Sequence, residues 1–417
     1  MKRVVIVGGG FAGLNAAKTL GGEADIHVTL IDRNNHHLFQ PLLYQVATAG
    51  LSPAEIAVPL RSILSAFRNI EVLQGEVIQV DFKNQTVMTD FGPVEYDYLI
   101  LCCGSKHAYF GNESWEAFAP GLKTIEQAIE IRRRILYAFE QAERIHDPNG
   151  QLKYLTFVIV GGGPTGVELA GAIGEMSRFT LKKDFRNINP ALTRIILIEA
   201  GLRILPAFSK SLSDRATRDL ESLGVQVWTS RKVTRIDENG IDIGEERITA
   251  GTVLWAAGIK SEGLSKTLGI ELDAMGRVIA QPDLSINRYP NVFVAGDQAN
   301  FSHQEGKPLP GISPVALQQG ICIAKNILRE INGLHRENFH YENKGQMATI
   351  GKKKAIAEIG KIRLSGLLAW CIWLVVHIYY IIGFNNRLFI LLKWATSYIT
   401  NKKGARLITN FKWRFYE

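Results

Sequence analysis

Two glycine-rich segments hold the residues of this chain whose spacing suits dinucleotide chemistry. Residues 8–13 read Gly-Gly-Gly-Phe-Ala-Gly, and residues 161–166 read Gly-Gly-Gly-Pro-Thr-Gly. In such a segment the first glycine permits a tight turn, the third lets the backbone approach a pyrophosphate, and the sixth lets a helix pack on its strand. Because a helix N-terminus attracts phosphate, the two segments predict two dinucleotide sites. The glycines in these roles are Gly8, Gly10, Gly13, Gly161, Gly163 and Gly166.

An acidic residue follows each glycine segment, where the ribose of a nucleotide would lie. These residues are Asp32 after the first segment and Glu199 after the second. A polar insertion at 182–193 lengthens the distance between the second segment and Glu199. A carboxylate there accepts hydrogen bonds from a ribose 2′-hydroxyl and repels a 2′-phosphate. Glu199 therefore favours NADH over NADPH, although Arg203 could bind a phosphate. The alternative for either acid is an ordinary solvent-facing position at the end of a strand.

The elements around each segment are those of a nucleotide-binding module. An apolar, β-branched run precedes each segment, and a helical pattern and a second strand follow it. Each module closes with a strand that ends on a glycine, Gly104 in the first and Gly258 in the second. A further strand at 292–295 leads into Gly296 and Asp297. The first module is therefore predicted to be interrupted by the second and completed after it.

Composition and charge limit the classes of function. Hydrophobic residues make up 46% of the 417 residues, which is enough for two or three substantial cores. The four cysteines form no evenly spaced framework, which indicates a reducing, intracellular compartment. The net charge of +8 arises in residues 361–417, where nine basic residues accompany one acid. This tail is also apolar, which favours an anionic lipid surface as its partner and argues against nucleic acid.

These features resemble those of the two-dinucleotide-binding-domain flavoprotein reductases and, within them, of type II NADH dehydrogenase, the single-subunit NADH:quinone oxidoreductase. The resemblance extends over nearly the whole chain. Its most specific parts are residues 40–47 (QPLLYQVA), 161–170 (GGGPTGVELA), 295–297 (AGD) and 383–387 (GFNNR).

The resemblance implies an α/β fold with two Rossmann-like domains and amphipathic C-terminal helices. An FAD domain, residues 1–120 and 280–360, would be interrupted by an NADH domain, residues 121–279, and followed by a membrane-association region, residues 361–417. FAD would be held without a covalent bond. The resemblance places its adenosine half on Gly8, Gly10, Gly13 and Asp32, its ring beside Pro41 and Leu42, and its ribityl chain on Asp297, with Gly104, Gly258 and Ala316 as further cofactor positions.

Glu168 is the residue expected to lie nearest the chemistry. It comes two residues after Gly166 in the first helical turn, and the family that the chain resembles has a glutamate there. A carboxylate could orient the nicotinamide or relay protons to the reduced acceptor. The alternative is an acid that favours a helix N-terminus through the dipole. No other side chain is required for hydride transfer, because the cofactors carry that reaction.

The electron acceptor is inferred partly from what the sequence lacks. Disulfide reductases of this fold place a Cys-x4-Cys or Cys-x-x-Cys pair at the flavin, and this chain has neither. A membrane quinone is therefore expected. The related enzymes resemble one another in an Ala-Gln-x-Ala-x-Gln segment, which reads SPVALQ at 313–318 here, with a proline in place of the first glutamine. Candidates for quinone contact are Gln318, Gln319 and His377, and no metal is expected.

The C-terminal region supplies access to a lipophilic acceptor. Residues 364–384 contain no Lys, Arg, Asp or Glu but include aromatic residues that favour the headgroup zone. Their length would also suit a transmembrane helix. His377 and a second amphipathic stretch with Lys393 instead favour helices in one leaflet. We expect peripheral attachment to the cytoplasmic face of the cell membrane, where the protein would serve a respiratory chain.

The leading hypothesis is an NADH:quinone oxidoreductase that does not pump protons. Two alternatives remain open at this stage: a reductase of a soluble electron carrier such as a ferredoxin, and a membrane-tethered flavoprotein that senses NADH. A homodimer is also compatible with the sequence.

Overall fold

The computed structural model describes residues 1–261, 263–400 and 404–408, and contacts divide the chain into two units. The first unit comprises residues 1–38, 57–106 and 259–343, and the second comprises residues 39–56, 107–258 and 344–417. Part of the predicted basic tail, namely Lys402, Lys403, Lys412 and Arg414, lies outside the described residues.

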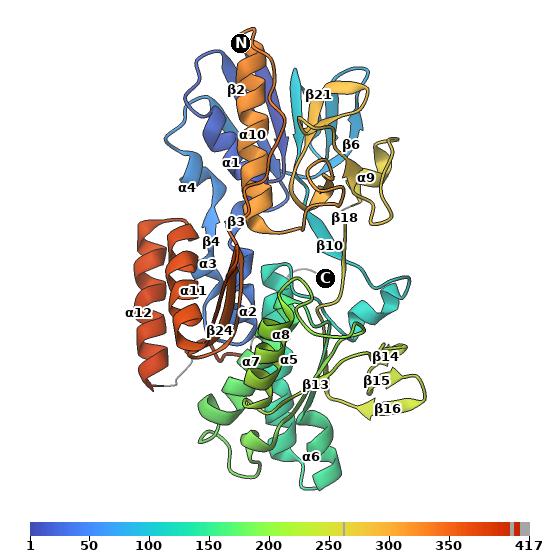
Figure 1. The fold of residues 1–417 in the computed structure, drawn as a ribbon, viewed down its shortest axis with the longest axis vertical. Coiled ribbons are helices and arrows are strands. Elements are labelled where there is room, and N and C mark those ends of the chain that lie inside the picture. The colour runs from blue at the N-terminus through green and yellow to red at the C-terminus, as the bar shows by residue number, and fades with distance from the viewer. Residues whose placement is uncertain (262, 401–403, 409–417) are drawn as a thin grey trace. The chain divides into compact units, whose positions relative to one another are not determined.

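A six-stranded sheet forms the centre of the first unit (Figure 1). Strand β1 (Lys2–Val7) pairs in parallel with β2 (Ile26–Asp32) and β9 (Tyr98–Leu101). Its β-branched residues are buried on both faces of the sheet, as is typical of parallel strands. The other strands are β5 (Ile70–Gln74), β21 (Tyr289–Val294) and β20 (Ser285–Ile286). Strand β21 pairs with β9, although almost two hundred residues separate them. This pairing confirms that the first module is completed after the second.

Two helices of the first unit pack closely on each other. Helix α1 (Phe11–Leu20) follows β1, and α10 (Ser313–Ile331) lies against it. A Cβ added at Gly320 would lie 2.1 Å from the carbonyl oxygen of Ala12, so this close approach requires a glycine. A small antiparallel sheet completes the unit, with strands β6 (Val77–Asp81), β7 (Thr86–Thr89) and β8 (Gly92–Glu95).

The second unit contains the second nucleotide-binding module. Its parallel sheet runs in the order β13-β12-β11-β17, with bounds Val225–Trp228, Arg194–Ile198, Thr156–Val160 and Thr252–Trp255. This sheet is contacted by helices α5 (Ile125–Arg144), α7 (Pro164–Glu175) and α8 (Lys210–Glu221). A π-helical turn, Met176–Thr180, follows α7, and the predicted polar insertion at 182–193 then contains a short 3₁₀ turn, Pro190–Leu192, before β12.

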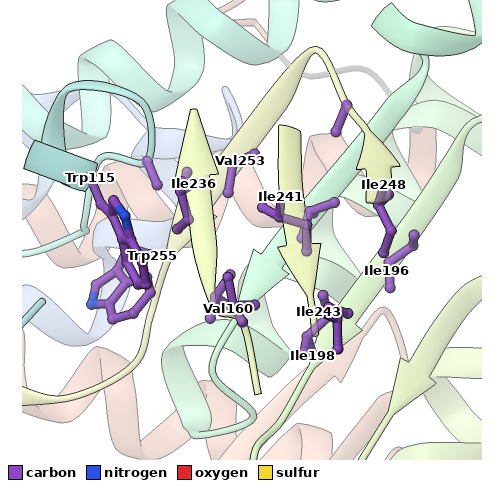
Figure 2. Close-up of a cluster of buried hydrophobic side chains, with 14 of the residues drawn as sticks. Trp115, Val160, Ile196, Ile198, Ile236, Ile241, Ile243, Ile248, Val253 and Trp255 are labelled. Atoms are coloured by element: carbon purple, nitrogen blue, oxygen red, sulfur yellow. The ribbon is translucent and has the colours of Figure 1, made fainter. Parts of the chain in front are cut away.

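A cluster of buried hydrophobic side chains joins this sheet to a three-stranded one (Figure 2). The three-stranded sheet consists of β14 (Arg235–Asp237), β15 (Gly240–Ile243) and β16 (Glu246–Thr249). Figure 2 shows Ile236, Ile241 and Ile248 of the three-stranded sheet in the same cluster as Val253 and Ile196 of the parallel sheet. Burial of such side chains is the main favourable term that holds the two sheets together.

The C-terminal region forms a three-stranded antiparallel sheet and two helices (Figure 1). The strands are β23 (Gln346–Gly351), β24 (Lys354–Ile359) and β25 (Ile362–Ser365), and the helices are α11 (Gly366–Tyr380) and α12 (Phe384–Thr400). Helix α11 packs on β24 through small side chains, since Ala355, Ala357 and Ala369 are fully buried. Among the described residues, no helix has both the length and the apolarity that a membrane span requires.

The second unit also contains a short segment from early in the chain. It includes α2 (Leu43–Ala47), which contacts α5 and α7, and α3 (Pro53–Ile56), which contacts α12. The second nucleotide-binding module and the C-terminal region thus belong to the same unit. The domain boundaries expected from the sequence divide the chain by function instead, and they stay a prediction.

Candidate functional site

The first glycine segment forms an open cradle at the start of α1. Gly8 has φ +104°, and a Cβ there would lie 2.3 Å from the carbonyl oxygen of Cys102. A Cβ at Gly13 would lie 1.9 Å from the Gly8 carbonyl oxygen, so position 13 must be glycine for the helix to pack against this loop. Gly10 differs, because no atom lies within 4 Å of its Cβ position. It is also the N-cap of α1 and has no side-chain cap, which leaves space and donors for an anion.

Asp32 holds this cradle from the end of β2. Its Oδ2 accepts a hydrogen bond of 2.6 Å from the Gly9 amide, and its Oδ1 accepts one of 2.7 Å from Asn34. Burial raises the pKa of this carboxyl group, against the opposing effect of the two amides. The same carboxylate that is predicted to bind the ribose therefore also fixes the loop.

His37 holds the same loop from the other side. Its Nδ1 lies 3.0 Å from the Gly9 carbonyl oxygen, and because a carbonyl only accepts, Nδ1 carries the hydrogen. Burial lowers the pKa of His37 to about 4, which keeps the ring neutral. No motif in the sequence marks His37 as a site residue, because histidines in a short strand are not specific to any function.

A cavity of about 210 Å³ in the first unit contains the predicted ribityl contact. Asp297 lines it together with Ser105, whose hydroxyl donates a hydrogen bond of 2.6 Å to Asp297 Oδ2. Gly104 has φ +76° and open space around its Cβ position, whereas the side chain of Ala316 packs 3.5 Å from the Cβ position of Gly296. The first unit thus brings together Gly8, Gly10, Gly13, Asp32, Gly104, Asp297 and Ala316.

The second cradle repeats the geometry of the first. Gly161 has φ +112°, and a Cβ at Gly166 would lie 1.9 Å from the Gly161 carbonyl oxygen. Gly163 is the uncapped N-cap of α7, with nothing within 4 Å of its Cβ position. Glu199 accepts hydrogen bonds from the Gly162 and Gly201 amides, of 2.7 and 2.6 Å. Gly258, which closes the module, has φ +77°.

The residues of the two cradles fit two dinucleotides. Each offers a helix N-terminus without a side-chain cap and a third glycine whose missing Cβ leaves the approach free. Each also has a carboxylate at the end of the second strand. These are the features that bind a pyrophosphate and a ribose.

Glu168 lies on α7 under strand β23. Its Oε1 accepts a long hydrogen bond of 3.4 Å from the Thr349 amide. Desolvation by burial raises the pKa of Glu168 to about 8, and the amide only partly offsets this effect. Such a carboxyl group gains and loses a proton near neutral pH, which neither the motif nor the resemblance could reveal.

The same face of α7 fixes β23 at two further points. A Cβ at Gly171 would lie 1.8 Å from the Ile350 carbonyl oxygen, so strand and helix are in backbone contact. One turn later, Glu175 accepts a hydrogen bond from the Lys352 amide. The C-terminal sheet therefore determines the environment of Glu168.

Pro41 and Leu42 belong to the second unit. They lie in a 3₁₀ turn, Gln40–Leu42, which leads into α2. Leu42 is fully buried and Pro41 is half-buried. The contacts of α2 with α5 and α7 explain why this early segment belongs to the same unit as the second nucleotide-binding module.

The three candidates for quinone contact have different surroundings. Gln318 exchanges two hydrogen bonds of 3.0 Å with the backbone of Glu342. Gln319 is buried, and its Oε1 accepts a hydrogen bond of 2.8 Å from the Gly296 amide. His377 lies in an aromatic cluster, where its ring stacks on Trp373 at 4.1 Å and burial lowers its pKa to about 4. Its Nδ1 donates to the Trp373 carbonyl oxygen at 2.8 Å, which leaves Nε2 as an acceptor.

The fold and the two cradles define a class, the flavoprotein oxidoreductases with two dinucleotide-binding domains. In agreement, residues 2–320 match the family model of the pyridine nucleotide-disulphide oxidoreductases, and residues 343–403 match that of the NDH2 C-terminal domain.

Curated relatives narrow the class to one family. The type II NADH:quinone oxidoreductases Ndh and NdhA of Mycobacterium tuberculosis are each 44% identical to the chain, over 98% of it and 90% and 89% of their own lengths. A type II NADH:quinone oxidoreductase of Staphylococcus aureus is 30% identical, over 86% of this chain and 90% of its own. The chain belongs to the type II NADH:quinone oxidoreductases, which confirms the resemblance seen in the sequence.

Solved structures agree on the fold. NDH2 from Plasmodium falciparum in complex with NADH superposes with a TM-score of 0.88 over 98% of this chain and 100% of that one, at 20% identity. The sulfide:quinone oxidoreductase from Aquifex aeolicus gives 0.74 over 91% and 90%, also at 20% identity. The predicted fold class, α/β with two Rossmann-like domains and C-terminal helices, is therefore confirmed.

Proposed function

We propose that this protein passes two electrons from NADH through non-covalent FAD to a membrane quinone, without pumping protons. FAD supplies the redox chemistry, because a flavin accepts a hydride and then gives up two electrons. The observation that carries the proposal is the pair of open helix N-termini, at Gly10 and Gly163, each paired with a carboxylate. Family membership supplies the quinone as acceptor.

The chain would divide cofactor binding between its two units. Gly8, Gly10, Gly13 and Asp32 would hold the adenosine half of FAD, Asp297 with Gly104 and Ala316 its ribityl side, and Pro41 and Leu42 its ring. Gly161, Gly163, Gly166, Glu199 and Gly258 would hold NADH. The support for these roles is the free space at the third glycines and the hydrogen-bonded acids.

Glu168 would supply a proton. Quinol formation needs two electrons and two protons, whereas a hydride brings two electrons and one proton, so the second proton must come from water. A carboxyl group whose pKa is about 8 is protonated at neutral pH and can be recharged from solvent. We assign this relay to Glu168.

His377 suits the quinone better than the two glutamines do. The amide groups of Gln318 and Gln319 already bond to backbone, whereas Nε2 of neutral His377 can accept a hydrogen bond from a quinol hydroxyl. We therefore propose that His377 contacts the product, and that Gln318 and Gln319 support the fold around Gly296 and Glu342.

Peripheral attachment at the cytoplasmic face of an anionic membrane is part of the proposal. Large apolar side chains of α11 and α12 are exposed, and Val375, Tyr379 and Phe389 are each more than half exposed. Arg387 lies on α12, where its charge would favour anionic lipid headgroups. A homodimer is also proposed, and sedimentation velocity in detergent would decide it.

Stopped-flow spectroscopy of the purified protein tests the function. NADH should bleach the bound flavin, and a lipophilic quinone should restore its absorbance at the rate of turnover. Flavin that stays reduced with quinone but is oxidised by a ferredoxin would show a soluble carrier to be the acceptor. A long-lived reduced state with neither acceptor would instead indicate an NADH sensor.

A further inference from the structure

A buried chain of hydrogen bonds attaches α12 to the segment that begins at Phe39. The indole Nε1 of Trp394 donates to Gln45 Oε1 at 2.8 Å, and Gln45 Nε2 donates to the hydroxyl of Tyr44 at 2.9 Å. All three residues are buried. Because a buried amide that loses its partner remains desolvated, such a bond fixes geometry strongly.

An ion pair next to Trp394 attaches the same helix to the end of the segment. Lys393 Nζ lies 2.5 Å from Glu55 Oε1, and the other carboxylate oxygen of Glu55 accepts the Ser52 amide at 2.6 Å. Two consecutive residues of α12 thus hold α2 through Gln45 and α3 through Glu55.

Aromatic contacts carry the connection on to α11 and back to Phe39. The rings of Trp394 and Trp373 lie 5.5 Å apart, Trp373 stacks on His377, and His377 meets Phe39 edge-on at 6.2 Å. Phe39 directly precedes the turn that contains Pro41 and Leu42. The network therefore encloses that turn from both of its ends.

The same two helices present apolar side chains to the outside. In α12, Ile390 and Trp394 are buried, whereas Phe389 and Leu392 are more than half exposed. One face of the helix therefore holds the segment at 39–56, and another is available to lipid. A change in how α12 sits in a membrane would move Trp394, and with it Gln45.

We propose that Trp394 and Gln45 are positioning residues for quinone reduction. They fix residues 39–47 to the helices that would meet the membrane, so the second half-reaction depends on their bond and the first does not. This rests on the proposed function, which places Pro41 and Leu42 beside the flavin.

Two matched Trp→Phe substitutions test the proposal. Trp394→Phe removes an indole N–H that is hydrogen-bonded, whereas Trp373→Phe removes one that is buried and has no partner in the described part of the chain. Both remove the same volume from one aromatic cluster. In stopped-flow with the full-length protein on phosphatidylglycerol vesicles, Trp394→Phe should slow flavin reoxidation by ubiquinone about fivefold, as loss of one buried hydrogen bond would. Reduction by NADH should be unchanged, and Trp373→Phe, which keeps an aromatic ring and the backbone carbonyl beside His377, should change reoxidation less than twofold.

A double variant asks whether the two residues act together. If they act through their bond, Gln45→Leu and Trp394→Phe combined should slow reoxidation no more than the larger single effect. If Trp394→Phe loses its flavin on purification, Tyr44→Phe can replace it. This change removes the hydroxyl that accepts from Gln45, and it should give a smaller effect of the same kind.

Equal effects of Trp394→Phe on both half-reactions would overturn the proposal, as would equal effects of the two Trp→Phe changes or additivity in the double variant. If wild-type flavin is not reoxidised by quinone at all, the proposed function fails instead, and the two failures are thus distinguishable.

Discussion

Glu168 shows how the environment of one residue determines its chemistry. Its pKa is raised by burial from 4.5 to about 8, so the folded protein binds a proton here that the unfolded chain releases above pH 4.5. Stability from this group is fully present below pH 4.5 and is lost as the pH rises through 8. Relative to Glu168→Gln, the wild-type free energy of unfolding should fall by about 1–3 kcal/mol between pH 5 and pH 8.

Urea titrations of both proteins across this range measure that difference. Parallel pH profiles would show that Glu168 is hydrated in the folded protein. The same variant, which cannot carry the proton, should also slow flavin reoxidation about a hundredfold at pH 7 if the relay operates.

We also expect the preference for NADH over NADPH to depend on a single residue, Glu199. Both carboxylate oxygens of Glu199 bind loop amides and would repel a 2′-phosphate. Glu199→Gln removes the charge, so the ratio of kcat/KM for NADH to that for NADPH should fall about tenfold. Steady-state kinetics with both nucleotides measures this ratio, and Asp32→Asn serves as the control because it lies in the other module. An unchanged ratio in Glu199→Gln would place the discrimination elsewhere, for example at Arg203.

At the scale of elements, α7 has one glycine that we expect folding to require, at its contact with β23, and another that we expect nucleotide binding to require. A Cβ at Gly171 would come within 1.8 Å of a strand carbonyl, so Gly171→Ala must push the two elements apart. We expect a loss of about 2–4 kcal/mol in unfolding free energy, the range for overpacked or strained sites. Thermal unfolding followed by circular dichroism measures it.

Gly163→Ala is the matched change on the same helix. Nothing lies within 4 Å of its Cβ position, and its φ of −71° suits any residue, so the fold should keep its stability. The added methyl group would instead occupy the approach of the pyrophosphate, and KM for NADH should rise at least about tenfold. A variant that binds NADH normally would show that the pyrophosphate does not lie over this helix end.

At the scale of the whole molecule, we expect the exposed apolar face of α12 to decide whether the protein binds a membrane. Phe389 and Leu392 are 59% and 55% exposed. Since transfer of each side chain into lipid is worth about 1.5–3 kcal/mol, Phe389→Ser with Leu392→Ser should weaken partition into anionic vesicles by at least about a hundredfold. Co-sedimentation with vesicles measures this. Ile78→Ser, at an exposed site of the first unit, is the control, and equal binding of both variants would contradict a membrane role for α12.

The sequence by itself determined both nucleotide modules, because glycine spacing, β-branched strands and a terminal acid act locally. It also determined the interruption of the first module, since β21 had the pattern of a strand without a local partner. The family followed from short motifs. The C-terminal region was less well determined: the apolar stretch 364–384 contains the end of β25 and a helix of only 15 residues, because Ile381 leaves helical geometry and Gly383 has φ +90°.

Only the tertiary structure decided the surroundings of the reactive groups. Burial raises the pKa of Glu168 against a strand amide that lies 181 residues away, and the neutral state of His37 depends on its burial under the Gly9 loop. Gln45 and Trp394 carry no motif, and 349 positions separate them, so their bond exists only after folding. Local patterns specify backbone and ligand type, whereas desolvation and long-range hydrogen bonds arise from packing, and packing sets the chemistry of the site.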